Sequence, residues 1–229
     1  MQSDTLTQLL EDRANKRSVV LATNLKSNSQ KLIYPFDNTD NSELYNAAKE
    51  AALNDRGRTL ETADGDVFLN VFNPPLRMII VGAVHISQPL SVMAEAAGYQ
   101  VTVVDPRRAF ATPERFPGMD LRVEWPDEAL KALGLDRRTA VVSLTHDPKL
   151  DDPALAVALP SDVFYVGALG SNRSHAKRVA RLQERGLSDA LIDRIHGPIG
   201  LDIGAKSPSE IAVSILGQVT QRLRQPDKS

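Results

Sequence analysis

The stretch that decides the fold is Arg77-Met-Ile-Ile-Val-Gly-Ala-Val-His-Ile-Ser87, an apolar run that ends in a glycine turn and leads into a helix start. A sheet presents backbone N–H groups to an anion in this way. Further runs that are close to continuously apolar follow at 101–104, 140–144 and 163–166. Such runs are typical of parallel strands covered on both faces. Because helical patterns separate them, the sequence predicts an α/β fold with a doubly wound, mainly parallel sheet.

The two prolines of Asn73-Pro74-Pro75 mark a boundary, because proline offers no backbone donor to a strand or helix. Upstream, Ala63-Asp-Gly-Asp66 is a hairpin signal. The other elements expected there are a helix over 5–15, strands over 17–23, 31–36, 59–62 and 67–72, and a helix capped at Asp40, with Glu43 at the capping-box spacing. We therefore expect a small α+β domain over 1–73, a larger domain over 77–224 and a frayed tail over 225–229.

Composition limits the classes of function. The 229 residues are 42% hydrophobic, which is enough for a packed core, and their formal net charge is −2. This charge gives no general attraction to nucleic acid or an anionic membrane, so an anion site must come from a local concentration of arginine. The sequence has no cysteine, no basic-apolar signal segment and no apolar run near the roughly 18 residues that span a bilayer. We expect a soluble cytoplasmic protein that binds neither nucleic acid nor membrane.

Gly82 and Asp105 form the first candidate site. A glycine after one strand and an aspartate at the end of the next are two parts of a dinucleotide-binding fingerprint, in which the aspartate accepts from a ribose hydroxyl. Ala83, Val84 and His85 complete the turn, but Val84 stands where the fingerprint has its second glycine and would obstruct a pyrophosphate. The alternative is a plain strand-to-helix turn in which His85 is a packing residue.

Two other predicted strands end in candidate binding residues. Arg107, Arg108 and Arg115 would place guanidinium groups, which suit phosphate, at the carboxyl edge of the sheet; the alternative is an exposed loop of surface ion pairs. Thr145, His146 and Asp147 would line the same crevice. For these, the alternative is that Asp147 and the following proline simply begin a helix.

A glycine-rich segment follows the last long strand. Gly167, Ala168 and Gly170 leave that strand and Ser171 can cap the next helix. The first turns of that helix carry Arg173, Lys177 and Arg178. A cation at a helix N-terminus opposes the helix dipole, which favours an anion there over a merely basic solvated face. We expect this loop and the arginines after the second strand to converge on one phosphate.

The last candidates are Gly200 and Asp202. They lie in an apolar loop whose glycines suggest backbone conformations that other residues avoid. Ser207, Pro208 and Glu210 then form a strong helix start.

Several motifs recur together in one order. They are Val81-Gly-Ala-Val-His85, Asp105-Pro-Arg107, Glu114-Arg-Phe-Pro117, Thr145-His-Asp147, Tyr165-Val-Gly-Ala-Leu-Gly-Ser171, and Pro198-Ile-Gly-Leu-Asp-Ile-Gly204 with Pro208-Ser-Glu-Ile-Ala-Val-Ser214. In this combination the chain resembles the XdhC/CoxI family of molybdoenzyme accessory proteins over residues 77 to about 222.

The resemblance implies a Rossmann-like domain that carries the molybdenum cofactor (molybdopterin) as cargo. It also implies support of cofactor maturation or insertion, with a xanthine-dehydrogenase-type or carbon-monoxide-dehydrogenase-type hydroxylase as client. Residues 1–76 lack the Gly-Ser-x-Pro-Arg and Gly-Gly-Cys stretches usual in the family, and Val84 replaces a glycine of its turn, so we expect a short or divergent member.

A cofactor-binding chaperone is favoured over an enzyme, because the motifs contain no nucleophile, base and orienting group at a suitable spacing. The alternatives are an NAD(P)-dependent oxidoreductase and a regulatory partner that has lost the ligand. The expected assembly is a homodimer.

Overall fold

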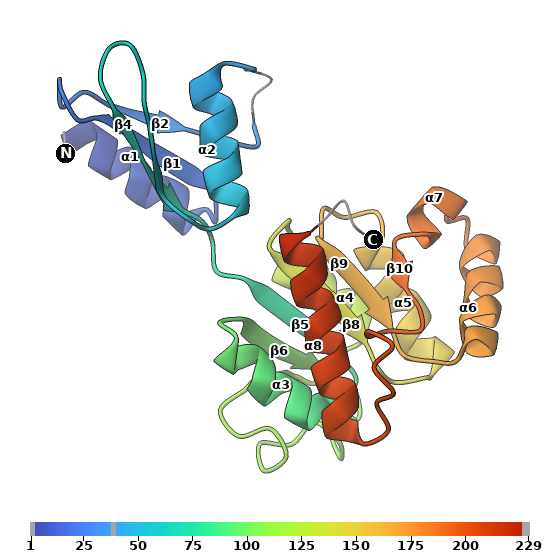
Figure 1. The fold of residues 1–229 in the computed structure, drawn as a ribbon. Coiled ribbons are helices and arrows are strands. Elements are labelled where there is room, and N and C mark those ends of the chain that lie inside the picture. The colour runs from blue at the N-terminus through green and yellow to red at the C-terminus, as the bar shows by residue number, and fades with distance from the viewer. Residues whose placement is uncertain (1–2, 38–39, 226–229) are drawn as a thin grey trace. The chain divides into compact units, whose positions relative to one another are not determined.

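The computed structural model describes residues 3–37 and 40–225. The chain divides into two compact units, Met1–Pro74 and Pro75–Ser229 (Figure 1). Of the expected frayed tail over 225–229, residues 226–229 lie outside the described residues. Among the described residues, no helix is both long and apolar enough to cross a membrane.

In its described residues, the first unit holds a four-stranded antiparallel sheet and two helices. Its elements are α1 (Ser3–Ala14), β1 (Val19–Asn24), β2 (Gln30–Ile33), α2 (Glu43–Leu53), β3 (Arg58–Leu60) and β4 (Val67–Phe72). The strand order is β2-β1-β4-β3, and the predicted hairpin joins β3 to β4. In β4, Val67 and Leu69 are buried against α2 while Phe68 and Asn70 are exposed, which is the alternation of a sheet with one covered face.

The predicted cap of α2 is wrong. The helix is capped by Ser42, whose hydroxyl accepts from the Tyr45 N–H at 3.4 Å. Asp40 accepts from the Ser42 N–H at 2.8 Å and so forms a turn that leads into the cap. Both residues suit an N-terminus, and the sequence alone does not say which one starts it.

In its described residues, the second unit holds a six-stranded sheet in which every pairing is parallel. Its elements are β5 (Arg77–Val81), α3 (Ser87–Ala96), β6 (Gln100–Val104), β7 (Asp120–Arg122), α4 (Pro126–Leu133), β8 (Thr139–Ser143), α5 (Pro148–Ala158), β9 (Tyr165–Ala168), α6 (Asn172–Glu184), α7 (Asp189–Ile192), β10 (Ile195–His196) and α8 (Pro208–Arg224). The strand order is β10-β9-β8-β5-β6-β7. With β5 numbered as the first strand and the sheet read from β7 to β10, this is the 3-2-1-4-5-6 order of a Rossmann fold. The predicted doubly wound α/β fold is therefore confirmed.

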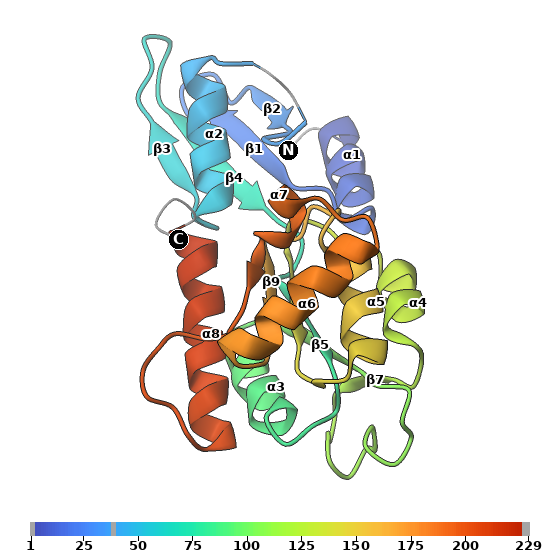
Figure 2. The same ribbon diagram turned by 90° about the vertical axis from the view of Figure 1, so that its right-hand side faces the viewer.

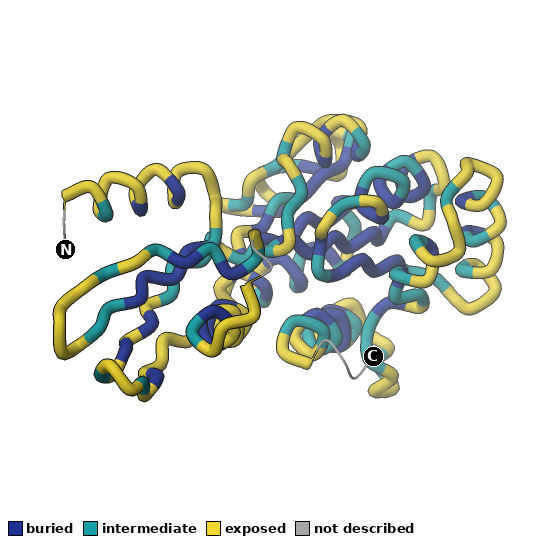
Figure 3. The backbone as a smooth tube through the Cα atoms, turned by 90° about the horizontal axis from the view of Figure 1, so that it is seen from above, coloured by how far each residue is buried: buried dark blue, intermediate teal, exposed yellow. Residues whose placement is uncertain are grey.

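Helices cover both faces of this sheet (Figure 2). Met78 and Ile80 of β5 pack into the core beneath α3 and α8. Ile79 and Val81 pack on the opposite face, beneath α4, α5 and α6. Every residue of the central strands β5 and β8 is buried, which is why their sequences are almost continuously apolar. Figure 3 shows the buried residues gathered in the interior, with exposed residues on the outer turns.

The elements that the pattern missed are short or polar. β7 is a three-residue edge strand, with Asp120 and Arg122 exposed. α5 was predicted only at its start, because Pro153 and two buried aspartates, Asp151 and Asp152, interrupt its apolar stripe. Neither strand propensity nor helical periodicity identifies such segments.

Candidate functional site

The carboxyl ends of four strands lie level at one edge of the second unit's sheet. The register pairs Val81 of β5 with Val104 of β6 and Ser143 of β8, and pairs Ser143 with Ala168 of β9. The connection after β5 leads to a helix on one face, and the connection after β8 leads to a helix on the other. Such a switch point is where open α/β proteins bind ligands.

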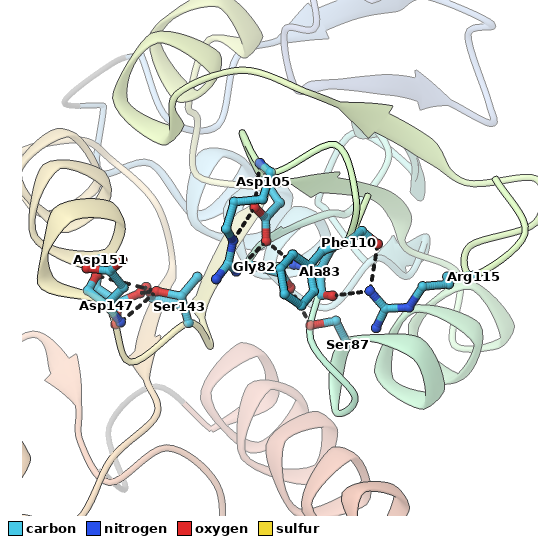
Figure 4. A network of polar contacts seen from close by, with 11 residues as sticks. Gly82, Ala83, Ser87, Asp105, Phe110, Arg115, Ser143, Asp147 and Asp151 are labelled. Carbon is cyan, nitrogen blue, oxygen red and sulfur yellow. Dashed lines mark hydrogen bonds and ion pairs between the residues drawn. The ribbon is translucent and has the colours of Figure 1, made fainter. Parts of the chain in front are cut away.

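The turn after β5 is closed by Asp105. The carboxylate is fully buried, and its Oδ2 accepts from the Ala83 N–H at 2.8 Å (Figure 4). Gly82 has a φ of +107°, and a Cβ there would lie 2.5 Å from Thr145 Cγ2, so only glycine fits. The hydroxyl of Ser87 donates to the Gly82 carbonyl at 2.5 Å. The two parts of the predicted fingerprint are therefore joined through the backbone of the turn.

Arg107 donates three further hydrogen bonds to the Asp105 carboxylate. Its Nε and Nη2 donate to Oδ1 and Oδ2 at 2.9 and 2.7 Å, and its backbone N–H donates at 2.9 Å. Burial opposes ionisation of Asp105, but the hydrogen bonds from Arg107 and the Ala83 N–H outweigh it and hold the pKa of Asp105 below its ordinary value. Asp105 and Arg107 thus engage each other, where the sequence suggested a ribose hydroxyl and a phosphate as their partners.

Arg115, which the sequence proposed as a guanidinium at the carboxyl edge, folds the next loop back over the turn. Its Nη1 donates to the carbonyls of Ala83 at 2.8 Å and Phe110 at 2.7 Å (Figure 4). Arg108, which the sequence also proposed, is exposed at this edge. The sequence did not reveal that Arg115 would bind two backbone carbonyls in place of a phosphate.

Val84 and His85 differ in their surroundings. Val84 is partly buried and packs against the core that contains α3. Its side chain occupies the position at which a dinucleotide fold needs a bare backbone for the pyrophosphate. His85 is exposed.

Two hydroxyl groups at the end of β8 donate hydrogen bonds to a buried aspartate, Asp151. The hydroxyls of Ser143 and Thr145 donate to Asp151 Oδ1 at 2.6 and 2.5 Å (Figure 4). Asp147 caps α5 by accepting from a backbone N–H at 2.9 Å, so it does begin a helix. His146 is exposed and has a φ of +62°, which is uncommon outside glycine. Such backbone strain is found preferentially at ligand sites.

The loop after β9 leads directly into α6. Gly167 and Ala168 are buried, and a Cβ on Gly167 would lie 2.6 Å from neighbouring side-chain atoms. Gly170 has a φ of +145°, and Ser171 caps the helix by accepting from a backbone N–H at 3.2 Å. Arg173 is exposed, and the first turn has no acidic residue. The positive end of this helix is therefore not neutralised within its own first turn.

Arg178, which the sequence named among the cations of this helix start, lies buried beneath the loop. It is 3% exposed, its Nη2 donates to the Leu169 carbonyl at 2.7 Å, and that nitrogen is 3.9 Å from Asp151 Oδ2. Its Nε and Nη1 have no hydrogen-bond partner among the described residues. Burial lowers the pKa of Arg178. The residue reads as part of a basic surface in the sequence; its spacing of one helical turn from buried Leu182 was the only signal of its burial.

The loop after β10 is held by α8. The Gly200 N–H donates to Gln218 Oε1 at 2.9 Å, and the same oxygen accepts from the Tyr165 hydroxyl at 2.6 Å. A Cβ on Gly200 would lie 2.4 Å from Ser214 Oγ. Gly200 thus serves close packing, while Asp202 is exposed. The predicted helix start at Ser207 is confirmed as a capping box.

The edge offers the groups that bind anions. Exposed Arg108 follows β6, exposed Arg173 and the N-terminus of α6 follow β9, and β8 and β5 lie between these two strands. Within the part of the chain that the structure describes, no three histidines or acidic residues are grouped so as to hold a metal ion.

The chain matches a known protein family over most of its second unit. The model of the XdhC Rossmann domain matches residues 78–219. The chain belongs to the XdhC family. The recognition made from its motifs is thereby confirmed.

Curated XdhC relatives include three proteins of similar identity. A Bacillus subtilis protein described as a probable xanthine dehydrogenase subunit is 31% identical over 180 residues, which are 75% of this chain and 52% of that protein. The molybdenum cofactor insertion chaperone PaoD of Escherichia coli K12 is 31% identical over 159 residues, 69% of this chain and 44% of PaoD. The uncharacterized protein YqeB of the same strain is 31% identical over 157 residues, 68% of this chain and 29% of YqeB. The chain thus spans about half the length of these relatives or less.

A solved structure shares the fold. It is a crystal structure of a xanthine dehydrogenase from Bacillus halodurans, with a TM-score of 0.68 and 23% identity, covering 98% of this chain and 65% of the other.

Proposed function

We propose that this chain binds the molybdenum cofactor and supports its maturation or its insertion into a xanthine-dehydrogenase-type or carbon-monoxide-dehydrogenase-type hydroxylase. The observation that carries the proposal is membership of the XdhC family over residues 78–219, together with 31% identity to a relative named a molybdenum cofactor insertion chaperone. The cofactor is cargo here, and the client hydroxylase and a homodimeric assembly belong to the same proposal.

The proposed cargo site is the carboxyl edge of the sheet in the domain over 77–224. Molybdopterin is an anion through its phosphate, and the N-terminus of α6 presents unneutralised N–H groups with exposed Arg173 beside them. Exposed Arg108 supplies a second cation from the loop after β6. The buried Arg178 beneath the loop adds positive potential at the same end of α6.

The chemistry proposed for the chain is binding and protection. Ser143 and Thr145 both donate to the same oxygen of buried Asp151, so the two hydroxyls share one acceptor, and Ser143 is itself fully buried. The exposed His85 and His146 have no described nucleophile among their hydrogen-bond partners. A chaperone without turnover is therefore favoured.

A dinucleotide-dependent oxidoreductase is the second candidate, because the strand order is that of dinucleotide-binding folds. Two features oppose it. Val84 stands at the sequence position of the fingerprint's second glycine, and the Asp105 carboxylate that would bind a ribose hydroxyl is engaged by Ala83 and Arg107.

The test is retention of cofactor. Purified protein is mixed with molybdopterin-form cofactor at micromolar concentration and separated by gel filtration, and the pterin that travels with the protein is quantified. A parallel titration of NADH fluorescence measures dinucleotide binding. Co-elution of pterin without saturable NADH binding is expected; NADH binding without pterin retention would replace the chaperone with the oxidoreductase.

A further inference from the structure

Phe110 is an aromatic side chain that the fold leaves uncovered beside the candidate site. It is 42% exposed, although it lies in the loop that follows β6 at the carboxyl edge of the sheet. Single exposed apolar side chains are common on protein surfaces. What distinguishes Phe110 is its place at the ligand-binding edge of a doubly wound sheet together with its contacts to two arginines.

The backbone of Phe110 is fixed to the turn after β5. Arg115 Nη1 donates to the carbonyls of both Phe110 and Ala83, at 2.7 and 2.8 Å (Figure 4). One guanidinium nitrogen thus binds both carbonyls. This shared donor keeps the backbone of Phe110 close to the turn after β5, at the switch point of the sheet.

The Phe110 ring is also oriented by a second arginine. The guanidinium carbon of Arg107 lies 4.4 Å from the ring centroid, and the guanidinium itself is held on the Asp105 carboxylate by two hydrogen bonds. Arg115 stands further off, at 5.9 Å from the same centroid. The Arg107 guanidinium therefore covers one side of the Phe110 ring, and its side chain is still 36% exposed, so the pair stays open to solvent.

From this geometry we propose that Phe110, backed by Arg107, is a stacking platform for a planar nitrogen heterocycle of the ligand. Aromatic side chains and guanidinium planes both stack on heterocyclic rings, and such contacts select a ring without reading its edge. The proposal rests on the proposed function for its ligand: the ring is the pterin of the cofactor or the base of its nucleotide-linked form. Phe110 then orients the ring, and the anion-binding groups near α6 hold the phosphate.

The test compares wild type with Phe110→Leu and Phe110→Tyr. Leucine keeps apolar volume without a π face, and tyrosine keeps the face. Phe68→Leu is the matched control, because Phe68 is 40% exposed and lies in β4 of the other unit. Dissociation constants are measured for molybdopterin-form cofactor, for pterin-6-carboxylate and for cytidine 5′-monophosphate.

We expect Phe110→Leu to weaken binding of the cofactor by about 5- to 150-fold, the range for losing one stacked ring. Phe110→Tyr and Phe68→Leu should stay within about twofold of wild type, since neither removes the platform. Parallel loss of pterin-6-carboxylate binding identifies the pterin as the stacked ring, and parallel loss of cytidine monophosphate binding identifies the base.

The outcomes separate this inference from the proposed function. If wild type binds cofactor and Phe110→Leu binds it equally well, the platform is wrong and the chaperone function stands. If wild type does not bind cofactor, the proposed function fails, and the platform survives only if a probe binds wild type and is lost in Phe110→Leu. Failure of wild type to bind any of the three compounds overturns both.

Discussion

Replacing Arg107 with alanine should destabilise the second unit by about 2–3 kcal/mol at neutral pH. Arg107 donates two side-chain hydrogen bonds, at 2.9 and 2.7 Å, to a carboxylate that is fully buried. A hydrogen bond to a charged group contributes roughly 1.5–3 kcal/mol. The Arg107 side chain is 36% exposed, so water screens the pair and the two bonds together count for less than their sum. Arg107→Ala leaves the Asp105 charge buried with backbone donors alone.

The loss should depend on pH. In the wild type the pKa of Asp105 is lowered in the folded state, so its contribution is present above the ordinary value of about 3.9 and is lost as the pH falls through the lowered value. In the variant, burial without the guanidinium should raise the folded pKa of Asp105, and protonation then stabilises the folded variant. The stability gap between wild type and variant should be widest near pH 7 and narrow toward pH 4.

The assay is thermal unfolding followed by tryptophan fluorescence. The chain has one tryptophan, Trp125, which lies in the second unit and reports on that unit alone. A loss of 2–3 kcal/mol corresponds to a fall in Tm of about 4–12 °C for a unit of this size. Arg108→Ala, an exposed neighbour, is the control and should shift Tm by less than about 2 °C. Equal melting of the two variants at pH 7 would refute the role given to the Asp105–Arg107 pair.

Three further predictions concern the turn after β5 and the helix starts. Gly82→Ala should lower the free energy of unfolding by about 2–4 kcal/mol, because the φ of +107° is strained for alanine and the Cβ would lie 2.5 Å from Thr145 Cγ2. The control Gly98→Ala, at a φ of +89° with nothing within 4 Å, should lower it by only about 1–2 kcal/mol. Similar melting curves for the two variants would contradict the close approach at Gly82. Ser207→Ala should lower stability by about 1 kcal/mol in urea unfolding, as expected for a lost capping hydroxyl, and no change would count against the cap. Arg173→Ala should weaken cofactor binding by about 1.5–3 kcal/mol with an unchanged Tm, whereas Arg185→Ala at the other end of α6 should leave binding unaltered; equal affinities would place the phosphate elsewhere.

The sheet was predictable because its strands are buried on both faces. Met78 to Val81 must be apolar at every position, and such a run is visible without a structure. The edge strand Asp120–Arg122 carries no such constraint, because two of its three residues are exposed. The cap of α2 was misplaced since Asp40 and Ser42 satisfy the same local rule.

The sequence predicted where the candidate site lies, but not which residues contact one another there. Gly82 and Asp105 mark the turn because spacing along the chain reveals two strand ends. Spacing does not reveal that Asp105 binds Arg107, since a carboxylate near an arginine in sequence is as compatible with a ligand as with an ion pair. Burial of Arg178 is likewise set by tertiary packing, which its basic surroundings in sequence conceal.

The most direct test is mass spectrometry of the small molecule that stays bound when the chain is purified from cells able to make the molybdenum cofactor. Denatured wild-type protein should release molybdopterin or its nucleotide-linked form, and Arg173→Ala protein should release less of it. A nicotinamide dinucleotide in place of a pterin would contradict the proposed function.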